Sequence, residues 1–170
     1  MTECLICEMK NEKNLLLYED DKLFAFLHPS PTAAGHIVLT TKEHKQILEQ
    51  IPDFIAKELF IKANKLSISA FESLGAEGTN ILIQNGIAAG QNFSHFIMNI
   101  IPRRTNDGLN LIWKPKQPSE EEMSTIELKL KEGTKTIGEF EKEKAKPKEI
   151  KEEKMSEKED YMIKYLKRIP

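Results

Sequence analysis

The chain has 170 residues, which is enough for one domain with a hydrophobic core of ordinary size. Apolar residues make up 39% and charged residues 31%, and the net charge of −2 lacks the basic excess that general nucleic-acid binding needs. No run of about 18 apolar residues occurs, so no membrane span is expected. The N-terminus has no basic stretch followed by an apolar core, so we expect no signal peptide and a cytoplasmic location.

Short apolar runs separated by turn residues begin the chain. Leu15–Glu19 and Leu23–Leu27 flank a pair of aspartates and predict a β-hairpin. After a loop containing proline and glycine, His36–Thr40 predicts a third strand. The overlapping pattern Thr40-x-x-Glu43 resembles a capping box and predicts a short helix that continues to Leu48.

The middle of the chain contains one long helical pattern and two further strands. Apolar residues recur at helical spacing over Pro52–Leu74, and Gly75 is a suitable stop. Asn80–Gln84 and Phe93–Ile101 predict the last core strands, joined across the glycine-rich turn Asn85–Gly90. Short hairpin connections around one main helix predict an α+β fold with an antiparallel sheet of about five strands.

The composition changes sharply near Thr134. Glu120–Lys131 still reads as a helix, but sixteen of the twenty-two residues from Glu139 to Asp160 are Asp, Glu or Lys. Such a stretch buries too little apolar area to offset the entropy of ordering it. We therefore interpret Glu139–Lys158 as an exposed linker or a solvated helix.

These patterns divide the chain into a domain at 1–113, a helical segment at 114–134 and a charged tail at 135–170. Within the tail, Ser156-x-x-Glu159 could cap a short helix carrying Tyr161 and Leu166. An apolar patch after a charged spacer suggests a docking segment. It could dock on its own domain, on a dimer mate or on another protein partner.

The only cysteines are Cys4 and Cys7, in the spacing C-x-x-C. A structural disulfide is disfavoured in a reducing compartment. The remaining interpretations are half of a metal site, a redox pair, or two unrelated buried thiols. The βαβ context of a thioredoxin-like redox motif is absent around them, which weakens the redox interpretation.

Three stretches between Cys4 and Trp113 together resemble the histidine-triad (HIT) family in their order and spacing. The matching residues are Tyr18–Asp21, Ala25–Leu27, Pro31, Gly35-His36, Thr41-Lys42-x-His44, Asn85-Gly86, Gly90-Gln91 and His95–Arg103. The resemblance implies a HIT-like fold, nucleotide binding and a homodimer that pairs Asn80–Gln84 and the helix Pro52–Leu74 across a two-fold axis.

The family's catalytic motif is altered in this sequence. Where the family has His-x-His-x-His, this chain has His95-x-Ile97-x-Asn99. The resemblance implies that the central position carries the histidine that attacks the α-phosphate, and isoleucine has no lone pair for that attack. On a strand these three side chains would share one face. We therefore expect a pseudoenzyme that lacks the covalent chemistry.

The resemblance also implies a structural zinc ion. Some relatives bind it through an N-terminal C-x-x-C, a histidine after the third strand and the first histidine of the triad. The counterparts here are Cys4, Cys7, His44 and His95, a Cys₂His₂ set suited to tetrahedral zinc. The alternative is that His44 is a surface residue and His95 a hydrogen-bonded core histidine.

For the nucleotide, the resemblance implies phosphate contacts at Asn85, Gly90, Gln91 and Ser94, an orienting contact from the Asn99 amide, and a sugar contact at His28. The ligand we expect is a nucleoside monophosphate such as AMP or GMP. A neutral imidazole at His28 accepts one hydrogen bond, whereas the carboxylate common there accepts two. The turn residues could also form an ordinary polar hairpin, and His28 could be an exposed loop histidine.

Three functions stay open on the sequence alone. The leading hypothesis is a catalytically inactive nucleotide-binding protein. The second is a nucleotide phosphohydrolase or nucleotidyl transferase with non-standard chemistry, in which water attacks the phosphoester directly. The third is an adaptor with a vestigial pocket that binds proteins through its tail.

Overall fold

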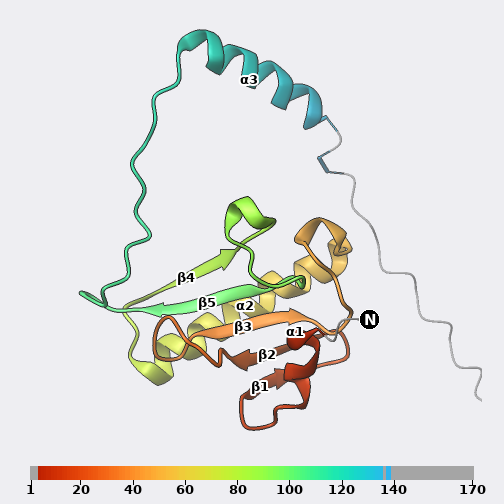
Figure 1. Ribbon diagram of the computed structural model, residues 1–170, viewed down its shortest axis with the longest axis vertical. Coiled ribbons are helices and arrows are strands. Elements are labelled where there is room, and N and C mark those ends of the chain that lie inside the picture. The colour runs from red at the N-terminus through yellow and green to blue at the C-terminus, as the bar shows by residue number, and fades with distance from the viewer. Residues whose placement is uncertain (1–3, 136, 139–170) are drawn as a thin grey trace, which may run out of the picture.

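A single five-stranded antiparallel sheet organises the protein, in the order β1-β2-β3-β5-β4 (Figure 1). The computed structural model describes residues 4–135, 137 and 138. The strands are β1 (Leu16–Glu19), β2 (Leu23–Leu27), β3 (Ile37–Thr41), β4 (Gly78–Ile83) and β5 (Met98–Arg103). The α+β class and the strand number expected from the sequence are both confirmed.

The predicted first hairpin is present, and an aspartate closes its turn. Asp20 Oδ1 accepts hydrogen bonds from the backbone N–H groups of Lys22 (2.9 Å) and Leu23 (2.8 Å). An aspartate that bonds the backbone two or three residues ahead forms a tight turn without help from the rest of the fold. Local sequence is therefore sufficient to position β1 against β2.

The main helix, α2 (Asp53–Leu74), covers one face of the sheet. Pro52 precedes its first residue, and Gly75 ends it in the left-handed conformation with φ 61°. Leu59, Ala63 and Ala70 are buried on its inner side against the sheet core. The predicted helix is thus confirmed at both ends.

A short N-terminal segment covers part of the opposite face. It consists of α1 (Leu5–Glu8) and the 3₁₀ turn η1 (Met9–Asn11). Ile6 packs with Phe24, Phe26 and Val38 in a second core cluster, while Leu23 and Ala25 of the same strand belong to the cluster under α2. Strand β2 is therefore buried on both faces, which explains why its sequence is apolar without alternation.

The helix expected from Thr40-x-x-Glu43 to Leu48 is wrong. Residues 42–47 form bends, and only a 3₁₀ turn, η2 (Leu48–Gln50), follows. The backbone N–H of Lys42 donates to the Lys22 carbonyl (2.7 Å), and the Lys45 carbonyl accepts from Phe96 N–H (2.6 Å). Because these groups have distant partners, they are not free for helical hydrogen bonds.

The last strand also starts later than expected, at Met98 and not at Phe93. Strand β4 ends at Ile83, which pairs with Met98. Strand β3 continues past Leu39, the other partner of Met98, but the Phe96 backbone bonds to the Lys45 carbonyl and the Thr40 hydroxyl. Residues 93–97 instead form an irregular segment beside the η3 turn (Ile87–Ala89). This change decides where the residues of the altered triad point.

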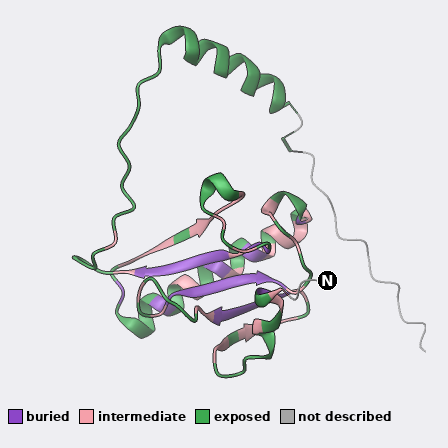
Figure 2. Ribbon diagram, in the orientation of Figure 1, coloured by how far each residue is buried: buried purple, intermediate pink, exposed green. Residues whose placement is uncertain are grey.

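The predicted C-terminal helix is α3 (Glu120–Gly133), which starts with a capping box between Ser119 and Glu122. Every residue from 110 to 135 is exposed, and Figure 2 shows α3 exposed along its whole length. None of the helices in the described residues is long and apolar enough to cross a membrane. The charged spacer and the docking segment expected within 139–170 lie outside the described residues.

Candidate functional site

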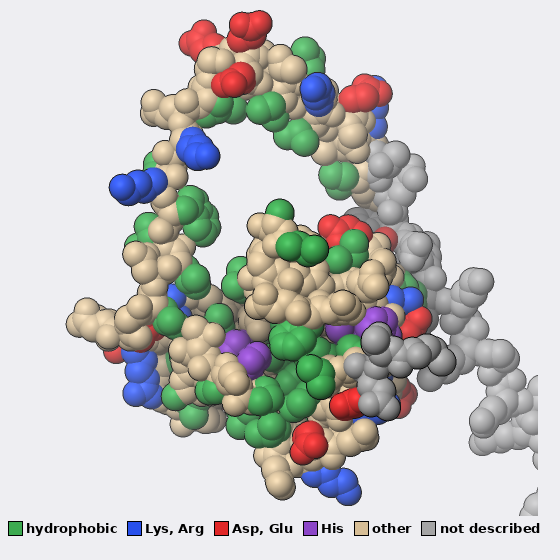
Figure 3. All heavy atoms as spheres, viewed as in Figure 1, with side chains coloured by type: hydrophobic (Ala, Val, Ile, Leu, Met, Phe, Trp, Pro, Cys, Tyr) green, Lys and Arg blue, Asp and Glu red, His purple; other side chains and the backbone are tan. Residues whose placement is uncertain are grey.

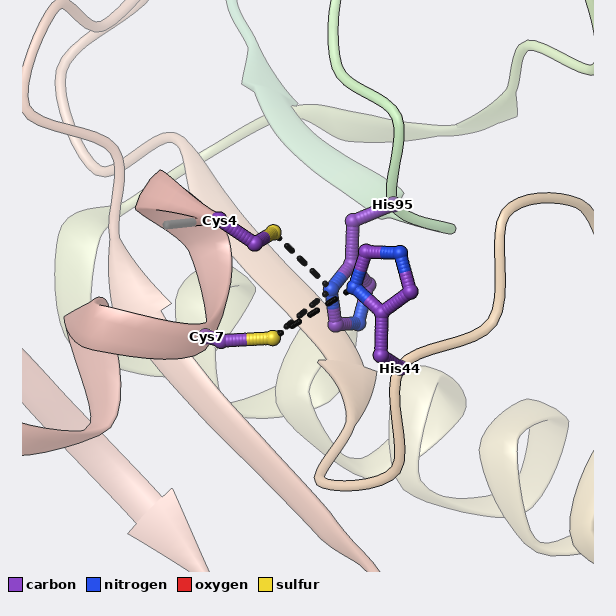
Figure 4. Close-up of side chains that lie close together, drawn as sticks. All are labelled: Cys4, Cys7, His44 and His95. Atoms are coloured by element: carbon purple, nitrogen blue, oxygen red, sulfur yellow. Dashed lines mark hydrogen bonds between the residues drawn. The ribbon is translucent and has the colours of Figure 1, made fainter. Parts of the chain in front are cut away.

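Four side chains from three distant segments converge at one end of the sheet (Figure 4). Cys4 and Cys7 come from the start of α1, His44 from the bend after β3, and His95 from the segment before β5. Their potential ligand atoms all lie within 4.8 Å of one another. His95 Nδ1 is 3.4 Å from both cysteine Sγ atoms, and His44 Nδ1 is 3.5 Å from Cys7 Sγ.

The ring of His95 is oriented for metal binding by its second nitrogen. His95 is fully buried, and its Nε2 donates to the Thr41 carbonyl at 3.2 Å, which leaves the Nδ1 lone pair facing the cysteines. Burial, together with the neighbouring His44, lowers the pKa of His95 to about 4. The imidazole is therefore neutral at physiological pH, which is the form that coordinates metals.

The cluster fits zinc in both chemistry and dimensions. Two thiols and two imidazoles are a usual tetrahedral set, and bonds of about 2.0–2.3 Å separate adjacent ligand atoms by roughly 3.3–3.8 Å. The separations of 3.4 and 3.5 Å between cysteine sulfur and histidine nitrogen lie in this range. An ion held here would join α1, the bend after β3 and the segment before β5.

A pocket of about 370 Å³ opens beside the last strand. It is bounded by the loop between β2 and β3, by β4 and β5, and by the segment before β5. Its lining includes His28, His36, Gln84, Gln91, Phe93, Ile97 and Asn99. In Figure 3, histidine side chains appear at two separate places on the same face of the molecule. Among the histidine rings, His28 stacks on His36, and His44 lies edge-on to His95.

Three polar side chains in the pocket form a connected set. The rings of His28 and His36 stack with their centroids 4.7 Å apart. His36 Nε2 lies 3.0 Å from Asn99 Oδ1, and Thr32 N–H donates to His36 Nδ1 at 3.3 Å. Because Nδ1 accepts, the hydrogen of the neutral ring is on Nε2 and is donated to Asn99. Burial lowers the pKa of His36, which favours this neutral form.

His28 does not have the free acceptor expected from the sequence. Its Nδ1 already accepts a hydrogen bond of 3.0 Å from Ser30 N–H. The hydrogen of the ring is then on Nε2, so the remaining nitrogen of His28 is a donor. The sequence alone could not show that His28 presents a donor and not an acceptor. This depends on the loop folding back so that Ser30 N–H reaches the ring two residues earlier.

The residues of the altered triad do not share one strand face. His95 and Ile97 precede β5, and His95 points into the cysteine–histidine cluster. Ile97 and Asn99 line the pocket. The alternation expected for a strand therefore applies only from Met98 onward, and the first residue of the triad pattern belongs to a different site from the other two.

The turn residues expected to hold phosphate are mostly engaged within the protein. Gln91 donates both amide hydrogens, to the Gln46 carbonyl (2.7 Å) and the Phe93 carbonyl (2.8 Å), and its Oε1 accepts from Gly86 N–H (2.7 Å). Gln91 thus holds the turn in shape and has no amide hydrogen left for a ligand. Gly90 has φ +84° and sits so close to Gln84 that a Cβ would lie 2.6 Å from its Nε2.

Asn85 and Ser94 lie outside the pocket lining. Asn85 accepts from Leu48 N–H (3.3 Å) and donates to the Glu49 carboxylate (3.0 Å), which ties the turn to η2. Ser94 is exposed. The pocket also uses residues that the sequence analysis did not single out, namely Ser30, Thr32 and Leu111. Ser30 and Thr32 follow His28 closely in the sequence, and this was the one feature that could have indicated that they line the pocket.

A family model for the HIT domain matches residues 9–106, more than half of the chain. The fold and the cysteine–histidine cluster agree with that match, and the chain belongs to the HIT family. An uncharacterised HIT-like protein of Methanocaldococcus jannaschii is 36% identical over 109 residues, covering 62% of this chain and 82% of its own. The adenylylsulfatase HINT3 of Arabidopsis thaliana is 32% identical over 109 residues, covering 63% of this chain and 55% of its own.

Solved structures of the family share the fold. A HIT family protein from Bacillus subtilis matches with a TM-score of 0.69 and 28% identity, over 76% of this chain and 96% of its own. A zinc-bound histidine-triad protein from Mycobacterium smegmatis matches at 0.59 with 25% identity, over 77% and 97%. A histidine triad nucleotide-binding protein from Candida albicans matches at 0.67 with 25% identity, over 77% and 96%.

Proposed function

We propose that this protein binds a nucleoside monophosphate such as AMP or GMP without carrying out the covalent chemistry of the HIT family. The observation that carries the proposal is Ile97, which lines the pocket at the central position of the triad pattern. A hydrocarbon side chain at that position can pack against a ligand but cannot attack phosphorus. The pocket itself, of about 370 Å³, is within the usual size range for small-molecule sites.

Asn99 gives the proposal a second support. A histidine at this position could exchange a proton with the reaction, whereas an amide does not titrate near neutral pH. Its Oδ1 is occupied by His36 at 3.0 Å in a buried contact. The pair holds the pocket in a fixed arrangement suited to binding.

The glycine-rich turn would shape the wall of the pocket on the phosphate side. Gly86 and Gly90 both have positive φ, 85° and 84°, and Gln91 fixes the turn through three hydrogen bonds. The N–H groups of Gly86, Ala89, Gly90 and Gln91 already donate within the protein, so the turn acts by its shape more than by its own donors. In this proposal Asn85 and Gln91 position the turn, and Gly90 and Ser94 lie at its open edge.

The decisive test is turnover of adenosine phosphoramidate by the purified protein, with thermal-shift titrations of AMP and GMP alongside. We expect binding together with a rate lower than that of a catalytic family member by a factor on the order of 10⁶, as for deletion of other nucleophiles. Mass spectrometry should detect no adenylyl adduct. Turnover at the level of a catalytic relative, or any histidine adduct, would show that the active site lies elsewhere.

The variant Ile97→His is the matched control. It restores a nitrogen at the central position but leaves Asn99 and His28 unchanged. We expect the rate to stay low in this variant, because a nucleophile without its neighbouring polar groups is poorly activated. A full recovery with this single substitution would show that the remaining residues are already competent for catalysis.

A structural zinc ion is the second part of the proposal. The support is the convergence of Cys4, Cys7, His44 and His95, with the Thr41 carbonyl orienting the His95 ring. Thiolate ligands require reduced cysteines, which agrees with a cytoplasmic location. The ion would supply no chemistry to the pocket, because all four coordination positions are occupied by protein.

The third part is a homodimer through α2 and β4. Strand β4 is at the edge of the sheet, so one side of its backbone is unpaired within the chain. The outer side of α2 and the middle of β4 expose large apolar side chains, namely Phe60, Ile61, Ile68, Phe71, Leu74 and Ile81. Pairing β4 with its copy across a two-fold axis would continue the sheet and cover this surface.

A further inference from the structure

The loop between β2 and β3 presents a hydrogen-bond donor to the pocket. Ser30 N–H donates to His28 Nδ1 at 3.0 Å, so the ring carries its hydrogen on Nε2. His28 is only partly buried and lines the pocket, and no other described residue bonds its ring. The one polar atom that His28 offers to a ligand is thus an N–H group.

Asn99 presents a second donor beside the first. Its Oδ1 accepts from His36 Nε2 at 3.0 Å, which directs the Nδ2 group away from His36. Nδ2 of Asn99 has no hydrogen-bond acceptor among the described residues, whereas every fully buried side-chain nitrogen or oxygen there has a partner. Nδ2 is therefore accessible, and it opens onto the pocket that Asn99 lines. His36 links the two residues, because its ring stacks on that of His28 and its Nε2 bonds to Asn99, so both donors belong to one wall of the pocket.

The described residues that line the pocket include no aspartate or glutamate. An anion placed against this donor pair, His28 Nε2–H and Asn99 Nδ2–H, therefore meets no repelling carboxylate in the wall. A sugar hydroxyl can accept from the pair and donate to Ser30, Thr32 or Gln84 in the lining, but it offers only one neutral acceptor oxygen. A phosphate group brings several acceptor oxygens, and hydrogen bonds to an ionised acceptor are the stronger kind.

We propose that the donor pair is a subsite for a second phosphate, and that the ligand is a nucleoside bisphosphate with one phosphate on the 5′ position and one on the 2′ or 3′ hydroxyl. This inference rests on the proposed nucleotide binding and specifies its ligand class. His28 and Asn99 act as specificity-determining residues. The second phosphate contacts the donor pair, and the rest of the nucleotide occupies the remainder of the pocket.

Isothermal titration calorimetry of the full chain tests the inference with four probes: AMP, adenosine 2′,5′-bisphosphate, adenosine 3′,5′-bisphosphate and inorganic phosphate. We expect one bisphosphate to bind about tenfold tighter than AMP, the gain from one or two charge-assisted hydrogen bonds. The comparison of the 2′ and 3′ isomers assigns the position of the second phosphate. Inorganic phosphate should bind far more weakly than either nucleotide.

Two substitutions at one position separate hydrogen bonding from loss of the side chain. His28→Gln retains a donor and should keep a preference for the bisphosphate. His28→Asp replaces the donor with a negatively charged acceptor and should reverse the preference in favour of AMP. Equal melting temperatures for both variants and the wild type would show that the fold is intact, and His28 is exposed enough for this to be expected.

The outcomes distinguish this inference from the function it rests on. If AMP binds but neither bisphosphate binds more tightly, the second-phosphate subsite is wrong and nucleotide binding stands. If inorganic phosphate binds as tightly as the bisphosphates, the ligand is not a nucleotide. If none of the four probes binds, the proposed function and the subsite both fail.

Discussion

Thr40 shows how one buried hydroxyl connects the sheet to the segment that carries His95. It is fully buried in β3, and its Oγ1 donates to the Phe96 carbonyl at 2.5 Å. The N–H of the same residue, Phe96, donates to the Lys45 carbonyl. Both backbone polar groups of Phe96, the residue after His95, are therefore bonded to residues about fifty positions away in the sequence.

We predict that Thr40→Val destabilises the protein by about 1–3 kcal/mol, because it leaves the Phe96 carbonyl buried without a donor. Chemical denaturation measures this loss. Thr40→Ser is the control, since it removes the methyl group but keeps the hydroxyl. A valine variant as stable as the serine variant would show that the hydrogen bond contributes nothing.

At the scale of elements, the cysteine–histidine cluster brings helix α1 to two segments that already bond to each other, the bend after β3 and the segment before β5. Helix α1 has only four residues and no side-chain cap, so it cannot be stable alone. It contacts the sheet through Ile6 and presents Cys4 and Cys7 to the histidines. Its position therefore depends on a small apolar contact and on the metal that we propose for the cluster.

We predict about one zinc ion per chain in protein purified without a chelator, as expected for a Cys₂His₂ site. Cys4→Ser and His95→Ala should lose the metal and at least about 3 kcal/mol of stability, since metal binding is linked to folding. Elemental analysis and thermal unfolding measure both effects, and His28→Ala is a control histidine outside the cluster. Absence of stoichiometric zinc, with both thiols freely reactive, would overturn the metal site.

Helix α3 depends on local signals alone. Its start is defined by the capping box of Ser119 and Glu122, and Lys131 pairs with Glu127 one turn earlier. Such exposed pairs contribute little, about 0.3–0.5 kcal/mol. Because residues 110–135 are exposed throughout, we propose that they add little to the stability of the domain.

A chain that ends after Lys116 should therefore unfold within about 2 °C of the full-length protein, because the described residues that it removes make only surface contacts, worth less than about 0.5 kcal/mol. Differential scanning calorimetry makes this comparison. A much lower melting temperature for the shortened chain would show that the C-terminal part packs on the domain or on its dimer mate.

At the scale of the whole molecule, one surface stands out by its apolar character. The outward stripe of α2 lies next to edge strand β4, and the hydroxyls of Ser67 and Thr79 meet at 2.5 Å between them. Phe71 is 53% exposed and Ile81 is 43% exposed. A contiguous apolar patch beside an unpaired strand edge is typical of a surface covered by another chain.

We predict a dimer by light scattering at micromolar concentration, and a monomer for the double variant Phe71→Glu with Ile81→Glu. The two charges would be buried without partners at the two-fold interface. Leu128→Glu on the exposed α3 is the control and should leave the dimer intact. A wild-type monomer at the same concentration would contradict the proposed dimer.

Features that depend on neighbouring residues could be predicted from the sequence by itself. The ends of α2 follow from Pro52 and Gly75, and the first hairpin follows from Asp20, because each of these acts within a few residues of its own position. The missing nucleophile at Ile97 is likewise a matter of residue type. Family membership could also be predicted, because it depends on the order of motifs in the sequence and the fold does not change that order.

Only the tertiary structure decided features that depend on distant partners. The segment after β3 is not helical because Lys42 and Lys45 bond to Lys22 and Phe96. Strand β5 begins at Met98 because β4 ends at its partner Ile83 and the Phe96 backbone bonds to Lys45 and to the Thr40 side chain. The donor character of the pocket depends on His36 facing Asn99, 63 residues later. Hydrophobic periodicity carries no information on which polar atoms form hydrogen bonds across the fold. Those hydrogen bonds determine which polar groups remain free to bind a ligand.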